Sequence, residues 1–120
     1  PCPEAAAIAP CICYEDAIGL HLDCSAAEYN AQLTEVFQQE FPVTELFEFE
    51  ILRTSNLFNL NFSTNGVSFY EFNFCCDYQS IEYISEDFFR DSANRVERIN
   101  ILGSQVNSSG FSLKLYRSSL

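Results

Sequence analysis

A seven-residue pattern of apolar and polar positions recurs three times along the chain. Apolar side chains occupy its second, fifth and seventh places: Leu46, Phe49, Ile51; Phe69, Phe72, Phe74; Val96, Ile99, Ile101. Copies spaced by roughly 20–30 residues are typical of a solenoid, because one unit cannot bury its apolar face and stacks on the next. The pattern predicts three parallel strands. Their connecting segments must cross over one face of the sheet, because parallel neighbours cannot be joined by a tight hairpin.

Other stretches predict the elements around these strands. Residues 19–23 alternate apolar and polar side chains, which indicates a short strand. Ser25-Ala-Ala-Glu28 has the form of a capping box, and apolar residues at helical spacing follow it. We therefore expect one amphipathic helix over residues 26–40. The prolines near the start argue against regular helix there, and Asn65-Gly66 indicates a tight turn before the second strand.

These elements divide one domain into three parts. Residues 1–24 form an N-terminal cysteine cap, residues 25–106 hold the leading helix and the repeats, and residues 107–120 cover the end of the sheet or form a tail. Phe111–Tyr116 alternates apolar and polar side chains and is the candidate last strand. The expected fold class is α/β, with a short solenoid, a parallel sheet and one N-terminal helix.

Composition narrows the possible partners. The 120 residues are 48% hydrophobic with a formal net charge of −11, so the chain is globular and ill suited to phosphate-rich partners, because phosphate binding needs Lys and Arg. We expect no nucleic acid and no anionic membrane as partner. No apolar run approaches the length of a membrane span. Five of the six basic residues lie in the last third, so head-to-tail self-association is an alternative to a simple drift of surface charge.

Cysteine usage predicts an oxidising compartment. Four of the six cysteines lie within the first 24 residues, at positions 2, 11, 13 and 24. Sequence alone allows three pairings among four cysteines. Zinc is a weaker alternative, because one residue rather than two to four separates Cys11 from Cys13. The chain begins at Pro1 without a Met, as a processed secreted chain does, and the sequons at Asn61 and Asn107 are candidate glycosylation sites. The predicted location is therefore secreted, extracellular.

The strand spacing and the cysteine cluster together resemble those of extracellular leucine-rich repeat proteins of arthropod type. The spacing is Leu-x-x-Leu-x-Leu, and the cysteines match a four-cysteine N-terminal cap that ends in Leu-His-Leu-Asp-Cys-Ser. The resemblance covers roughly residues 2–103. It implies a leucine-rich repeat solenoid, and it implies the disulfides Cys2–Cys13 and Cys11–Cys24.

The polar positions within the three copies form the candidate binding surface. In a solenoid these positions lie on the concave face of the sheet, where repeat proteins commonly bind. The candidate residues are Phe47, Glu48, Glu50, Tyr70, Glu71, Asn73, Glu97, Arg98 and Asn100. His21 is expected in the row of Glu50, Asn73 and Asn100. We expect a secreted, non-enzymatic module that binds protein; the alternative is a self-assembling or accessory subunit of an extracellular complex.

Catalysis and cofactors find little support in the sequence. His21 is the only histidine, and no nucleophile motif surrounds any serine, so we expect no enzyme activity, no cofactor and no metal. Cys75 and Cys76 remain after the cap is formed. They stay reduced, join each other, or bridge to another chain, and leftover thiols in a secreted protein favour the intermolecular bridge. A homo-oligomer is then expected.

Overall fold

The computed structural model describes the backbone of residues 2–42, 44–54, 58–76 and 81–102. Side chains within these ranges are described except at 53, 54, 58, 75, 76, 81–83 and 102. The candidate strand Phe111–Tyr116 and the sequon at Asn107 lie outside the described residues.

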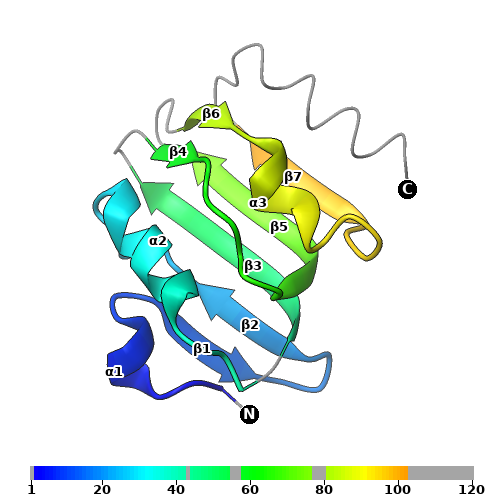
Figure 1. The fold of residues 1–120 in the computed structure, drawn as a ribbon. Coiled ribbons are helices and arrows are strands. Elements are labelled where there is room, and N and C mark those ends of the chain that lie inside the picture. The colour runs from blue at the N-terminus through cyan, green and yellow to red at the C-terminus, as the bar shows by residue number, and fades with distance from the viewer. Residues whose placement is uncertain (1, 43, 55–57, 77–80, 103–120) are drawn as a thin grey trace.

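A five-stranded, mostly parallel sheet forms the centre of the molecule (Figure 1). Its strands lie in the order β1-β2-β3-β5-β7. Their bounds are β1 Ile12–Glu15, β2 Leu20–Asp23, β3 Glu45–Thr54, β5 Ser68–Cys76 and β7 Arg98–Leu102. Only the pair β1–β2 among the strands of this sheet is antiparallel; β2–β3, β3–β5 and β5–β7 are parallel.

The register of the parallel strands aligns the three copies of the apolar pattern. Phe49 pairs with Phe72, and Phe72 pairs with Ile99. Ile51 and Phe74 align in the same way, and Phe74 lies beside Ile101. Equivalent positions of the repeated pattern are therefore neighbours in space, which confirms the predicted parallel pairing of the three strands.

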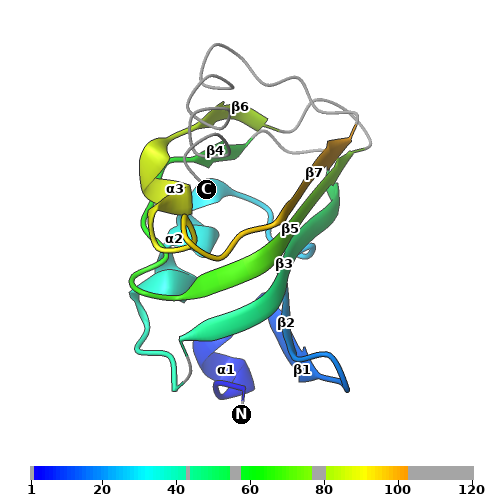
Figure 2. The same ribbon diagram turned by 90° about the vertical axis from the view of Figure 1, so that its right-hand side faces the viewer.

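A second layer covers one face of this sheet (Figure 2). It consists of α2 Asn30–Gln38, α3 Glu86–Arg90 and a two-stranded parallel sheet of β4 Phe58–Leu60 and β6 Ile81–Ile84. These segments connect the parallel strands, as crossovers must. Leu60 and Ile84 are buried, as their apolar character predicts. The turn at Asn65-Gly66 is also confirmed, with both residues at positive φ.

Phenylalanine rings fill the space between the two layers. Phe49 contacts rings from α2, β5 and α3, and the ring centroids lie 5.4–5.9 Å apart. Among the described side chains, the fully buried phenylalanines are Phe37, Phe49, Phe69, Phe72, Phe74, Phe88 and Phe89. Aromatic pairs at such distances add to the stabilisation from buried area. The core therefore depends on rings contributed by α2, β3, β5 and α3.

Two disulfides join the N-terminal segment to the first strands. Cys2 is bonded to Cys13 and Cys11 to Cys24, which confirms the pairing implied by the resemblance. Cys11 and Cys24 are buried in the core. Disulfide bonds are compatible with an extracellular location. No helix in the described ranges is both long enough and apolar enough to span a membrane.

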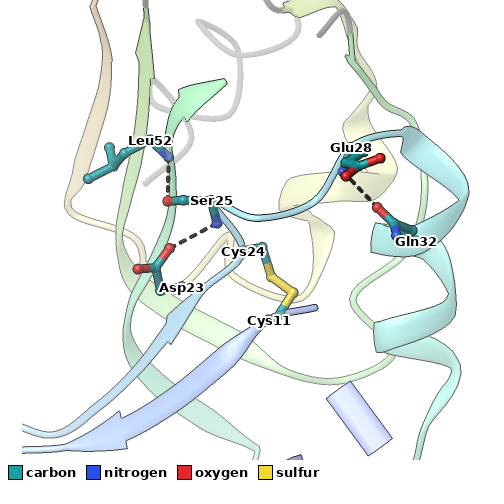
Figure 3. Close-up of a disulfide and its surroundings, with 7 residues drawn as sticks. All are labelled: Cys11, Asp23, Cys24, Ser25, Glu28, Gln32 and Leu52. Carbon is teal, nitrogen blue, oxygen red and sulfur yellow. Dashed lines mark hydrogen bonds between the residues drawn. A yellow bond between two sulfur atoms is a disulfide. The ribbon is translucent and has the colours of Figure 1, made fainter. Parts of the chain in front are cut away.

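The predicted capping box is wrong. The helix α2 begins at Asn30 rather than at residue 26, and no side chain caps it. Figure 3 shows where Ser25 is used instead: its Oγ accepts a hydrogen bond from the backbone N–H of Leu52 in β3, at 2.8 Å. Asp23 in turn accepts from the Ser25 N–H, at 2.9 Å. Ser25 is therefore committed to joining the cap to β3, which leaves it unable to cap a helix.

The first 24 residues also differ from the prediction. A single helical turn, α1 Ala5–Ile8, fits between Pro3 and Pro10. Three alanines and an isoleucine form it, and Ile8 is buried. The prolines limit the helix to this length but do not exclude it. The chain is thus α/β with a mostly parallel sheet, three short helices within the described ranges, and disulfides near its N-terminus.

Candidate functional site

The face of the five-stranded sheet opposite α2 and α3 is called here the open face. Strand register places two rows of side chains on it. The first row is Tyr14, His21, Glu48, Glu71 and Arg98; the second is Ile12, Asp23, Glu50, Asn73 and Asn100. The intervening apolar residues of β3 and β5 are buried beneath. The sequence therefore builds a polar surface on a rigid apolar sheet.

The predicted position of His21 is wrong by two residues. The structure pairs His21 with Glu48, and it is Asp23 that precedes Glu50, Asn73 and Asn100 in the second row. The cap strand is not a copy of the repeated pattern, so the spacing of the repeats did not determine its register. A one-row shift of this kind changes which charges are neighbours.

His21 lies between two carboxylates. Its Nδ1 lies 2.7 Å from Glu48 Oε1, and its Nε2 lies 2.9 Å from Asp16 Oδ2. Both contacts favour a proton on the ring, through hydrogen bonding and through charge. Burial would lower the pKa of His21, but the two carboxylates outweigh it and the pKa is raised. The imidazolium form is therefore favoured in this position.

Aromatic rings run along one side of the carboxylates. The ring of Tyr14 is stacked on His21 with centroids 4.7 Å apart, and His21 lies 5.8 Å from Phe47. Phe47 is stacked on Tyr70 at 5.3 Å, and the guanidinium of Arg98 lies over Tyr70 at 6.0 Å. This series of rings crosses four strands. We call it the aromatic row.

Amide side chains hold the glutamates of the open face in place. Asn73 Nδ2 donates to Glu48 Oε2 and, at 2.8 Å, to Glu71 Oε2. Asn100 Nδ2 donates to Asn73 Oδ1 at 2.7 Å, which orients that amide. Arg98 Nη1 lies 3.3 Å from Glu71 Oε1. The carboxylates at this end of the rows are therefore fixed by donors from β5 and β7.

Glu50 differs from the other carboxylates of this surface. Burial, together with repulsion from Glu48 and Asp23, raises the pKa of Glu50 to about 7. A protonated Glu50 also hydrogen-bonds with Glu48, which favours the neutral form. His21 opposes this, but its effect on Glu50 is smaller than that of burial or of the neighbouring carboxylates. The folded structure thus favours the neutral form of Glu50.

The structure brings most of the predicted binding residues together. Phe47, Glu48, Glu50, Tyr70, Glu71, Asn73, Arg98 and Asn100 all belong to the open face. Glu97 is exposed, and its backbone N–H bonds to Tyr70 O at the entrance to β7. Glu97 precedes β7 and belongs to neither of the two rows.

Sequence reasoning missed Tyr14 and Asp16. Both belong to the hairpin β1–β2, which places Tyr14 opposite His21. Asp16 accepts from the N–H groups of Ile18 and Gly19 and thereby closes the turn. Two signals were present: a Cys-Tyr-Glu stretch of strand character after Ile12, and an Asp-x-x-Gly turn before Leu20.

The remaining predicted sites are less informative. Asn61 is exposed, so its sequon is accessible, although glycosylation stays a prediction. The side chains of Cys75 and Cys76 lie outside the described residues. Both ring nitrogens of His21 face carboxylates, so neither is placed to take a proton from a serine. Among the described residues, no group of three or more histidine, cysteine or acidic side chains has the geometry to hold a metal ion.

Comparison of this chain with family models, with curated proteins and with solved structures finds no match. The leucine-rich repeat identity therefore stays a prediction.

Proposed function

We propose that the chain is a secreted, non-enzymatic recognition module that binds a protein partner through the open face. On this proposal the fold is a short leucine-rich repeat solenoid with an N-terminal cap. The aligned copies of the apolar pattern on β3, β5 and β7 support the solenoid. The disulfides near the N-terminus are compatible with secretion.

One observation carries the proposal: the aromatic row lies beside ordered carboxylates on a face of the sheet that none of the described helices covers (Figure 2). Phe47 and Tyr70 are only half-buried, although their rings are large. Half-exposed aromatic side chains with few rotamers are common anchors of protein interfaces. Hydrogen bonds through Asn73 and Asn100 fix the neighbouring polar groups. Such order lowers the entropic cost of binding.

The experiment replaces both anchor rings. Proteins retained by the immobilised chain from the natural extracellular fluid are identified, and the affinity of the main one is then measured in purified form. We expect the double variant Phe47→Ala/Tyr70→Ala to bind it at least about tenfold more weakly, as for interface hot spots. Glu35→Gln is the matched control, because Glu35 is exposed on α2, on the covered side of the sheet. Equal affinity of the double variant and the control would refute the proposal.

A further inference from the structure

We propose that the partner presents a basic segment, and that an arginine or lysine side chain of that segment binds beside Glu50, between the aromatic row and Asp23. This inference rests on the proposed function and names the chemistry of the partner. It is carried by the arrangement of positive groups that the open face already contains.

The chain itself shows how this surface binds a cation. Arg98 places its guanidinium over the ring of Tyr70 while Nη1 contacts Glu71. A planar guanidinium is suited to such combined stacking and ion pairing. The open face thus binds one cationic group by a carboxylate and an aromatic ring together.

His21 repeats this arrangement at the other end of the row. Its ring lies against Tyr14 and near Phe47, and carboxylates face both of its nitrogens. Two internal cations, each held by carboxylates and rings, therefore flank the middle of the surface.

The middle of the surface has the carboxylates, and no cation from the described residues forms an ion pair with Glu50 or Asp23. Glu50 lies between Asp23 and Asn73 in the second row, with Glu48 on its own strand. A positively charged side chain arriving here would relieve the repulsion among these three carboxylates.

The charges also discriminate among ligands. An acidic surface on a chain of net charge −11 repels phosphate groups and acidic proteins and attracts basic ones. The described acidic groups lack the geometry of a metal site. A basic polypeptide can place its cation at Glu50 and its aliphatic stem along Tyr14, which lies close enough to Glu50 to be affected by its charge, because long basic side chains pair a charged end with an apolar stem.

Affinity for the basic segment should depend on pH in a defined direction, because protonation of Glu50 competes with binding of a cation. The groups that face Glu50 are Glu48 on its own strand, Asp23 and His21 on β2, and Tyr14 on β1. A cation binds the charged form of Glu50, so the segment should bind more tightly as pH rises through about 7. Loss of the charge on His21, whose pKa the neighbouring carboxylates raise, removes a competing cation and acts in the same direction.

The test uses the whole chain and a synthetic peptide in which arginine alternates with serine. The control peptide carries citrulline, which has the shape of arginine without its charge. Affinities are measured by titration calorimetry at about pH 6 and about pH 8, either side of the midpoint for Glu50. Glu50→Gln and Glu35→Gln remove one negative charge each, from the open face and from α2. The melting temperatures of both variants are measured as well, to check that each is folded.

We expect the arginine peptide to bind and the citrulline peptide to bind far more weakly. Glu50→Gln should weaken the arginine peptide about fivefold, the upper range for a partly exposed ion pair, while Glu35→Gln leaves it unchanged. Affinity for the arginine peptide should be about threefold higher at about pH 8 than at about pH 6 for the natural chain, because Glu50 goes from mostly neutral to mostly charged, and the increase should be smaller for Glu50→Gln.

Four results would overturn the inference. Absence of arginine-peptide binding, or equal binding of the citrulline peptide, shows that the partner need not be basic. Equal effects of the two glutamine variants show attraction to net charge alone. A concentration-dependent dimer that Glu50→Gln abolishes shows that the occupant is a second copy of the chain. None of these results decides whether Phe47 and Tyr70 anchor the natural partner. The proposed function is tested separately, by the double variant Phe47→Ala/Tyr70→Ala.

Discussion

His21 of β2 and Glu48 of β3 face each other across neighbouring parallel strands, with Nδ1 2.7 Å from Oε1. This pair joins the disulfide-bonded cap to the repeated strands through a side chain. It also begins the row of charges that continues through Glu71 to Arg98. The disulfide-bonded N-terminal segment is therefore part of the candidate binding surface.

We predict that the chain is more stable at about pH 6 than at about pH 8. The folded-state pKa of Glu50 is raised to about 7, and that of His21 is raised above its ordinary value. The folded chain therefore binds more protons than the unfolded chain in this range, so the free energy of unfolding falls as pH rises. Thermal melts across this range measure the effect.

The variant Glu50→Gln separates the contribution of Glu50 to the pH dependence of stability from that of His21. The variant should melt higher than the natural chain at about pH 8, where it removes a repelled charge, and similarly to it at about pH 5, where Glu50 is largely neutral. A natural chain that gains stability between pH 6 and 8 would contradict the assignment. Stability and partner binding thus depend on pH in opposite directions, as expected of a site kept for function.

We predict that the buried disulfide contributes more to stability than the outer one. Each closes a loop of similar length, with sequence separations of 11 and 13, for which loop entropy suggests about 3 kcal/mol. Cys11 and Cys24 are also core side chains, whereas Cys2 and Cys13 are half-buried. Denaturant unfolding of the two paired alanine variants compares them. Equal losses would show that burial of the bridge adds nothing.

We predict that Ser25→Ala destabilises the chain by about 1 kcal/mol while Glu28→Ala changes little. Ser25 Oγ is the acceptor for the Leu52 N–H, and removal leaves that donor unpaired in a half-buried position. The Glu28 side chain is exposed, and it is the backbone N–H of Glu28 that binds Gln32 Oε1. Chemical unfolding measures both variants. A loss on Glu28→Ala as large as that on Ser25→Ala would restore the capping-box interpretation.

Much of the sheet could be predicted from sequence because its pattern is repeated. The spacing of Leu46, Phe49 and Ile51 recurs in the second and third strands, and equal spacing in parallel strands fixes which residues are neighbours. The aromatic pair Phe47–Tyr70 follows from the same alignment. Repetition thus carried information about tertiary structure that a single strand does not contain.

The cap could not be predicted in the same way because it is not repeated. The register of His21 depends on the hairpin from Ile12 to Asp23 and on its docking against β3. Ser25 likewise has two competing uses, a helix cap and an acceptor for β3, and only the tertiary contact decides between them. The contributions of Tyr14 and Asp16 to the site arise from this same hairpin.

We predict that Phe72→Ala lowers the free energy of unfolding by about 3–5 kcal/mol, the usual cost of removing a buried phenylalanine ring. The Phe72 ring is fully buried and contacts Phe49, Phe69, Phe88 and Phe89. Phe47→Ala should cost far less, because the Phe47 side chain is only half-buried on the open face. Similar losses in the two variants, measured by urea unfolding, would mean that Phe47 belongs to the core.

The most direct test of the central claim is to map the bound partner onto the chain by amide chemical shifts. The labelled chain is titrated with the partner identified by affinity capture, and shifts are followed residue by residue. The account predicts that the largest changes occur at Phe47, Glu50, Tyr70 and Asn73, and that α2 and α3 change little. Changes concentrated on α2 and α3, with the open face unaffected, would contradict it.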